Sequence, residues 1–342
     1  MLWCVLGVWP AFALDKINMA GSGTSSDAII FIAEKMGFFH DEDLSVEVTT
    51  FDSGVKMIVP LGTGDLDVAT SSGTAALYNA VARGIDIKIV ASSGSAPPHY
   101  GHNILIIRKD LIDTGRYKHP TDIKGLKVSM PSPGSSATAT LNSYLIKNGL
   151  SFKDIDPVYL SYPNQVAALA SGKIDVGLTA EPQASQAIKN FGAVRISSDD
   201  VMDPYHEASV TLMSGKFMQK RPDAARRFMR AFLKAARFYN DGLADGLLKG
   251  PRGEDVVAIL TEFTTTKDPN VYRTISPQGV DPDGHLNVAG LQRDLEFYKT
   301  QNWIEADVDV QQAIDLRFGE AALRELGPYI SAEQVHSPRA EH

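Results

Sequence analysis

The chain has 342 residues, of which 44% are hydrophobic and 22% are charged, and its formal net charge at pH 7 is -8. This composition is typical of a soluble globular protein, and the length is enough for two domains of ordinary size. Because the sequence contains no cluster of lysine or arginine residues, we expect neither nucleic acid nor an anionic membrane surface as a partner.

The first thirteen residues, MLWCVLGVWPAFA, are apolar and uncharged. They are too few to span a bilayer, which takes about 20 residues, and Ala11-Phe12-Ala13 fits the small-residue cleavage pattern of a secretory signal. We therefore predict a signal peptide over residues 1–13 and a periplasmic location; a buried N-terminal strand is the alternative. The only cysteine, Cys4, lies in this segment, so the mature chain would have no disulfide, thiol nucleophile or cysteine-based zinc site.

A strand, a turn and a helix follow. The segment Ile17–Ala20 is a short apolar run, and Gly21–Ser26 is rich in glycine and serine. A helical pattern covers residues 28–36 and ends before Gly37, since glycine is a frequent helix stop. The alternating residues 44–48 predict the next strand.

The same unit occurs a second time. Val128–Met130 predicts a strand, Pro131–Ser136 is again a turn of small residues, and a helical pattern covers 137–147 before Gly149. Residues 157–160 predict the strand that follows. A repeat of this length indicates two structural units of the same kind.

Each half continues with a matching strand and a polar loop. Gly64-Asp65-Leu66-Asp67-Val68 corresponds to Gly172-Lys173-Ile174-Asp175-Val176. Strands that alternate with helices predict parallel sheets with helices on both faces. In such sheets ligands bind outside the carboxyl ends of the strands, so we expect a cleft between two facing sets of loops.

The predicted domain boundaries follow from this repeat. Lobe one would comprise residues 14–102 and 207–342, and lobe two residues 103–206. The chain would cross between the lobes near 99–102 and again near 203–206, and two crossings allow hinge bending. Helical patterns near the C-terminus predict extra helices that pack on lobe one, at residues 222–236, 254–263, 288–298 and 310–323.

These motifs resemble the nitrate/sulfonate/taurine/pyrimidine (NMT1-like) family of ABC-transporter solute-binding proteins. The resemblance is carried by Gly64–Val68, Asp122–Val128 with Gly134-Ser135-Ser136 behind it, and Ala167–Asp175 with Glu181-Pro182. It covers roughly residues 16–240. It implies a type II periplasmic binding fold with two doubly wound lobes and a hinge. It also implies no catalysis and handover of a solute to ABC permease subunits in the membrane.

Loops at helix N-termini are suited to anions, because unpaired N–H groups and the helix dipole place partial positive charge there. Small residues let a ligand approach the backbone, and hydroxyl groups add hydrogen bonds. A single such loop is more often a plain helix cap, but the symmetric placement of these loops on two lobes favours ligand binding for the set. The candidate ligand-binding residues are Ser22, Gly23, Thr24, Asp52, Ser71, Ser72, Gly73, Ser132, Ser135, Ser136, Ala137, Tyr162, Glu181 and Tyr205.

The predicted loops contain no arginine or lysine, which favours a monoanion such as a sulfonate, carboxylate or nitrate over a phosphate monoester. Glu181 could accept from an ammonium group on the ligand, or could simply be a first-turn helix acid. Tyr162 and Tyr205, like Phe51 and Tyr100, could form apolar walls or belong to the hinge and core.

Three other interpretations stay open. His99, His102 and His206 gather near the crossings, but we expect hydrogen-bonded histidines rather than a metal site. Asp281–Gly284 lacks the later ligands of a calcium loop and predicts a turn. An enzyme or a sensor module on the same fold remains the alternative function; the main expectation is a monomeric, cofactor-free binding protein that is not an enzyme.

Overall fold

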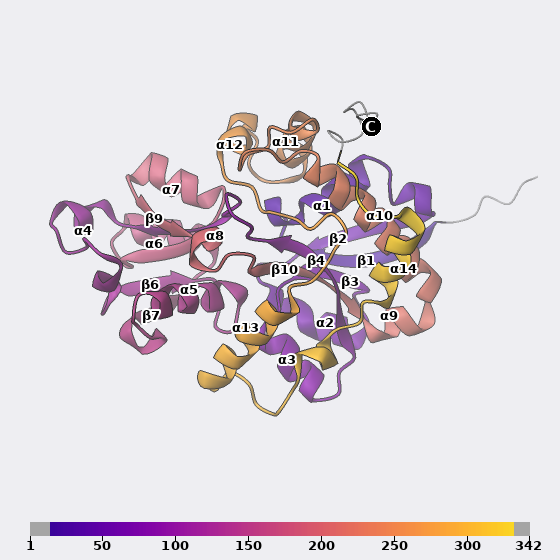
Figure 1. The fold of residues 1–342 in the computed structure, drawn as a ribbon, viewed down its shortest axis with the longest axis horizontal. Helices are drawn as coiled ribbons and strands as arrows, with labels where there is room; N and C mark the ends of the chain where they lie inside the picture. The colour runs from indigo at the N-terminus through magenta and orange to yellow at the C-terminus, as the bar shows by residue number, and fades with distance from the viewer. Residues whose placement is uncertain (1–13, 332–342) are drawn as a thin grey trace, which may run out of the picture.

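The computed structural model describes residues 14–331 and shows two α/β lobes (Figure 1). The predicted signal peptide over residues 1–13 lies outside the described residues. Within the described range, no helix combines the length and apolarity that crossing a bilayer requires.

Each lobe is built on one five-stranded sheet. The first has the order β2-β1-β3-β10-β4 and the second the order β7-β6-β8-β5-β9. The strands of the first sheet are β1 (Asp15–Gly21), β2 (Leu44–Thr50), β3 (Val68–Ser71), β4 (Ile87–Ser95) and β10 (Glu207–Ser214). The strands of the second sheet are β5 (Asn103–Ile107), β6 (Lys127–Met130), β7 (Asp156–Tyr159), β8 (Val176–Ala180) and β9 (Val194–Ser198).

The sheets are mixed, whereas the sequence pattern predicted parallel ones. In the first sheet β10 runs antiparallel to β3 and β4, and in the second β5 runs antiparallel to β8 and β9. Each of these two strands directly follows a passage of the chain from the other sheet. The passages occupy residues 96–102, between β4 and β5, and residues 203–206, directly before β10.

The helices cover the faces of both sheets. They are α1 (Ala28–Lys35), α2 (Ile58–Thr63), α3 (Ala75–Ala82), α4 (Lys109–Asp113), α5 (Ser136–Lys147), α6 (Tyr162–Ala170), α7 (Gln183–Phe191), α8 (Asp199–Met202), α9 (Gly215–Lys220), α10 (Pro222–Asn240), α11 (Gly253–Phe263), α12 (Pro269–Thr274), α13 (Val288–Thr300) and α14 (Arg317–Leu326).

One predicted helix is wrong in its extent. Residues 310–323 divide into a 3₁₀ turn at Val310–Ala313 and the start of α14. Between them Ile314 pairs with Ile89 at the edge of the first sheet, and the Asp315 N–H donates to the Ile89 carbonyl (2.9 Å). Sheet pairing at this point breaks the helical hydrogen bonds that the apolar pattern suggested.

Helix α13 joins the lobes rather than covering lobe one alone. It packs against both α3 and α5, and Figure 1 shows it beside the junction of the two lobes. Phe297 of α13 makes edge-on contacts with Phe152 of the second lobe and with Trp303, at centroid distances of 5.5 Å for each pair. Such pairs add about 0.5–1.5 kcal/mol each beyond burial, so this aromatic cluster stabilises the lobe junction.

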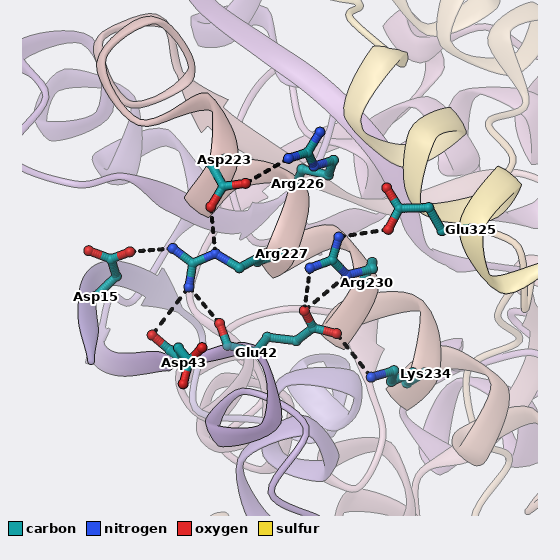
Figure 2. A network of polar contacts seen from close by, with 9 residues as sticks. All are labelled: Asp15, Glu42, Asp43, Asp223, Arg226, Arg227, Arg230, Lys234 and Glu325. Atoms are coloured by element: carbon teal, nitrogen blue, oxygen red, sulfur yellow. Dashed lines mark hydrogen bonds and ion pairs between the residues drawn. The ribbon is translucent and has the colours of Figure 1, made fainter. Parts of the chain in front are cut away.

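A network of charged groups fixes α10 to the first lobe (Figure 2). Glu42, buried in a 3₁₀ turn (His40–Glu42), accepts from Arg230 Nη2 (2.6 Å) and Lys234 Nζ (3.0 Å). Arg230 also pairs with Glu325 of α14 at 2.7 Å. Burial alone would raise the pKa of Glu42, but the hydrogen bonds from Arg230 and Lys234 lower it below its ordinary value.

We expect Glu42→Gln to lower the free energy of unfolding by about 2 kcal/mol, since charge-assisted hydrogen bonds contribute about 1.5–3 kcal/mol. Chemical denaturation at pH 7 measures the loss. Because the folded-state pKa of Glu42 is lowered, the wild-type advantage should disappear as acid protonates this carboxylate. Glu254→Gln is the control: its pair with Arg273 is exposed, and exposed pairs contribute little. Equal losses in both variants would contradict this role for Glu42.

Candidate functional site

A cavity of about 910 Å³ lies between the lobes. Its walls come from the loops that follow β1, β2 and β3 in the first lobe and β6, β7 and β8 in the second. All of these strands belong to the parallel parts of the two sheets, so the loops lie at carboxyl ends, where ligands bind in open α/β sheets. The volume is within the range of small-molecule sites.

Eleven of the fourteen predicted residues line this one cavity. They are Ser22, Gly23, Thr24, Asp52, Ser71, Ser72, Ser132, Ser135, Ser136, Ala137 and Tyr162. Residues far apart in the sequence therefore meet at one place, with contributions from both lobes.

The N-terminus of α3 is already satisfied by the protein. Thr74 Oγ1 accepts from the Leu77 N–H at 3.1 Å. The Ala75 N–H donates at 2.8 Å to the carbonyl of Gly134 in the opposite lobe. Ser71, Ser72 and Thr74 line the cavity, but this helix end has few N–H groups left for a ligand.

The N-terminus of α5 is free. The Ser135 hydroxyl donates backwards to the Ser132 carbonyl (2.9 Å) and does not cap the helix. Within residues 14–331, the N–H groups of Ser136 and Ala137 have no hydrogen-bond acceptor, as is usual for a first helical turn without a cap. Both residues line the cavity, so α5 directs unpaired N–H groups and its positive dipole end at the cavity.

Two buried residues with hydroxyl groups, at the end of β3, line the same cavity. Thr70 Oγ1 and Ser71 Oγ have no hydrogen-bond partner among the described residues, and both residues are less than 10% exposed. Because buried polar groups in native proteins are nearly always paired, these hydroxyls are available to a bound molecule. Phe51, Met57 and Phe263 add apolar surface to the same cavity.

Three predicted residues lie outside the lining. A side chain at Gly73 would meet Leu291 and the Tyr78 hydroxyl, so this position faces the core. The Glu181 carboxylate accepts from the N–H (3.0 Å) and the hydroxyl (2.9 Å) of Ser185. It caps α7 instead of facing the cavity, and burial raises its pKa.

Tyr205 is the third. Its side chain is 59% exposed and its backbone has a positive φ of 62°. Its N–H donates to Ala96 and its carbonyl accepts from Asn287, so this residue belongs to the second passage between the lobes.

Besides Thr70 of β3 and Ala208 and Ser209 of β10, sequence reasoning missed two parts of the lining next to helices. The first is the end of α11 at Phe263 with Thr264, Thr265 and Lys267 behind it. Figure 1 shows α11 and α12 at the top of the view, on the side of lobe one that faces α7. The polar run Thr264-Thr265-Thr266-Lys267 directly after an apolar helix is the signal that could have identified it.

The second omission is Asp27, in the 3₁₀ turn Ser25–Asp27 before α1. It lines the cavity but is 2% exposed. Among the described lining residues, Asp27, Asp52 and Lys267 are the only charged ones. Asp52 pairs with Lys56 at 2.6 Å, and Lys267 Nζ donates to the carbonyls of Thr261 and Glu262.

The lobes touch directly around the cavity. Besides the Ala75–Gly134 bond, the Ser25 hydroxyl donates to the Glu181 carbonyl (3.3 Å) and the Ser136 hydroxyl to the Ala208 carbonyl (3.0 Å). The structure therefore shows the two sets of loops in contact.

Two of the three histidines near the passages, His102 and His206, have side-chain partners in the protein. His102 Nε2 lies 3.4 Å from the Ser26 hydroxyl, and burial lowers the pKa of His102 to about 4. His206, Asp203 and Asp294 lie close enough that one ligand atom from each falls within 4.8 Å of the others. His206 already bonds to Asp294 (3.0 Å) and Thr140 (3.1 Å), so these contacts account for the cluster.

The loop at Asp281 forms a turn, as predicted. Asp281 Oδ1 accepts from the N–H groups of Asp283 (2.9 Å) and His285 (3.1 Å). Such a side-chain-to-backbone pattern is common for aspartate in turns.

Residues 16–245 match the model of the NMT1-like family. The chain belongs to the NMT1-like family. This match covers both sheets and all but the C-terminal segment of the lining. One relative of this chain is a protein of Escherichia coli (strain K12) that is named as a candidate aliphatic sulfonates-binding protein. The two are 25% identical over 267 residues, which is 77% of each chain.

Solved structures share the fold of this NMT1-like protein. The alkanesulfonate-binding protein SsuA from Xanthomonas axonopodis pv. citri, bound to MOPS, has a TM-score of 0.68 at 20% identity and covers 88% of this chain and 98% of its own. The periplasmic nitrate-binding protein NrtA from Synechocystis PCC 6803 has a TM-score of 0.75 at 14% identity, and the match covers 95% of this chain and 91% of NrtA. The predicted two-lobed α/β fold is confirmed.

Proposed function

We propose that this protein is the extracytoplasmic solute-binding component of an ABC importer. It captures a small monoanion, of the sulfonate, carboxylate or nitrate type, between its lobes and delivers it as a monomer to the permease subunits. The proposal is supported by relatives and fold neighbours that are named for binding sulfonates and nitrate.

The observation that carries the proposal is the free N-terminus of α5 in a cavity that Thr70 and Ser71 also line, with hydroxyls that have no partner among the described residues. An anionic head group placed there would accept from the Ser136 and Ala137 N–H groups and from one of these hydroxyls, because consecutive side chains of a strand point to opposite faces. Helix N-termini favour negative charge, and burial between two lobes strengthens each of these hydrogen bonds.

Capture follows from the position of the donors. They belong to different lobes, so one ligand bonds to both only when the lobes are together. A ligand can shift the open–closed equilibrium only through its higher affinity for the closed form, and contacts to both lobes supply that difference.

A thermal-shift panel of sulfonates, carboxylates and nitrate tests this function. At a concentration 100 times its dissociation constant, a true ligand stabilises the fold by about 2.7 kcal/mol. We expect Ser136→Trp to fill the cavity and abolish the shift, and Ser171→Trp, at an exposed position after α6, to leave it intact. A shift that survives Ser136→Trp, or a panel without any shift, would contradict the proposal.

A further inference from the structure

A second cavity, of about 490 Å³, adjoins the larger one between the lobes. Four residues line both cavities: Pro163 and Gln183 of lobe two, and Thr265 and Lys267 of lobe one. Pro163, Thr265 and Lys267 are exposed, and Figure 1 shows α11 and α12 on the side of lobe one that faces α7. At this junction, which we call the cleft mouth, the larger cavity meets solvent.

The cleft mouth carries one positive charge without a counter-ion. Lys267 is the only lysine or arginine among the described residues that line either cavity. Within residues 14–331 it forms no ion pair, and its Nζ donates to backbone carbonyls only. Asp52, the other exposed charged residue in the lining of the larger cavity, is neutralised by Lys56 at 2.6 Å.

The ammonium group of Lys267 has a defined position. It donates to the carbonyls of Thr261 (3.2 Å) and Glu262 (2.7 Å) in the last turn of α11. Helix C-termini attract cations, because their last carbonyls carry partial negative charge. An ammonium group has three donors, so two of them hold Lys267 in place and the third is left for water or a passing anion.

Asp268 lies on the outer side of the cleft mouth. It lines the smaller cavity but not the larger one, and its Oδ1 accepts from the Asn270 N–H (3.0 Å) at the start of α12. For an anion in the smaller cavity its charge opposes that of Lys267, so the two side chains should affect an approaching anion in opposite directions.

The molecule as a whole repels anions, since its formal net charge at pH 7 is -8. A monoanion therefore reaches the cleft against a repulsive field. A local positive charge at the mouth lowers this barrier, and clefts with low-dielectric walls focus such fields and raise association rates. The effect depends on salt, because the screening length falls from about 30 Å at 0.01 M to about 3 Å at 1 M.

We propose that Lys267 is an electrostatic steering residue that draws the anionic solute into the cleft mouth. It acts before the anion reaches the N-terminus of α5, so it raises the association rate and leaves the dissociation rate unchanged. This inference rests on the proposed function and adds the route by which the solute enters the same site.

The test measures association of three monoanions, nitrate, propane-1-sulfonate and butanoate, by rapid-mixing fluorescence at pH 7. Calorimetric titration first establishes which of them bind. In about 0.01 M salt we expect Lys267→Gln to slow association about three- to fivefold, the effect of one charge at close range in water. The factor should be the same for each probe, because each carries one charge, and it should fall below about 1.5-fold in 1 M salt.

Three further variants separate charge from structure. Lys267→Arg keeps the charge and should associate within about twofold of the wild-type rate. Lys109→Gln makes the same change in net charge in α4, at the far end of lobe two (Figure 1), and should keep the wild-type rate. Asp268→Asn keeps a side chain that can cap α12 but removes the negative charge, so it should speed association about twofold in low salt.

The outcomes distinguish the two proposals. If a probe binds but Lys267→Gln associates as fast as Lys109→Gln, the role of Lys267 is wrong and the proposed function stands. The same holds if the slowing persists in 1 M salt or appears in the dissociation rate, as loss of a contact in the bound state would cause. If none of the three probes binds the wild type, the proposed function is wrong and this inference fails with it.

Discussion

His206→Ala is expected to lower the free energy of unfolding by about 3–5 kcal/mol, as removal of one partner from a buried ion pair does. His206 and Asp294 are 1% and 3% exposed, and their side chains bond at 3.0 Å. The other ring nitrogen bonds to Thr140 of α5 at 3.1 Å. The imidazole thus ties the second passage to α5 and to α13, and its loss leaves the Asp294 charge buried without a partner.

The double variant His206→Ala, Asp294→Ala is the control for this prediction. Removing both charges eliminates the uncompensated carboxylate, so its loss should be smaller than the sum of the two single losses. Urea denaturation of the four proteins gives the coupling energy. Strictly additive losses, or a His206→Ala loss below about 1 kcal/mol, would show that the pair does not stabilise the lobe junction.

The same pair predicts a pH dependence. Burial alone would lower the pKa of His206, but attraction to Asp294 outweighs it, with Asp203 and Asp199 adding to the effect, and the pKa rises from 6.5 to about 9. Burial raises the pKa of Asp294, and attraction to His206 and Arg293 offsets this rise only in part. The folded state therefore binds the proton more tightly, and the stabilisation is complete below about pH 6.5 and lost as the pH rises through 9.

The difference in unfolding free energy between wild type and His206→Ala follows this titration most directly in the upper part of the range. Burial raises the pKa of Glu207 to about 7 and that of Asp199 to about 6, and His206 opposes both rises, so these two acids contribute to the difference at the lower end. We expect the difference to decline between pH 6.5 and pH 9, and a difference that stays constant over this range would contradict the assignment of a protonated His206.

Gly134→Ala is expected to weaken ligand binding by at least about tenfold, because binding selects the closed form and this change opposes closure. The Gly134 carbonyl bonds across the cleft to the Ala75 N–H. A methyl group at Gly134 would lie 2.5 Å from the Ala75 side chain, so the lobes would have to separate at this contact. Calorimetric titration with the tightest anion of the panel measures the change.

Gly125→Ala is the control for backbone strain. Gly125 lies in the same lobe with a φ of 74°, close to the 61° of Gly134, but an added methyl group there meets no atom within 4 Å. Both variants should lose about 1–2 kcal/mol of stability, since left-handed backbone disfavours a side chain. Equal affinities in the two variants would show that the Ala75–Gly134 contact does not control closure.

The local elements of the fold could be predicted from the sequence, because their signals are local. The glycine after α1 and the alternating residues of β2 predict the ends of these two elements to within two residues of the observed bounds. The antiparallel direction of β5 and β10 could not be predicted, because it depends on how the chain passes from one sheet into the other. The break at Ile314 and the bridging of the lobes by α13 depend on distant partners, Ile89 and Phe152.

The candidate site divides in the same way. Turns that follow parallel strands could be assigned to one cleft, because strand ends at one sheet edge must lie near each other. Which residues in those turns face the cleft is set by tertiary packing: Gly73 faces Leu291, and Glu181 caps its own helix. Asp27 was overlooked because an acid in a first helical turn is common, and only its missing partner distinguishes it.

A crystal structure of the protein with the tightest anion of the panel tests the central claim most directly. We expect the anionic group within hydrogen-bonding distance of the Ser136 and Ala137 N–H groups, with the lobes in contact around it. A ligand bound outside the cleft, or one that turns its anionic group away from α5, would contradict the account.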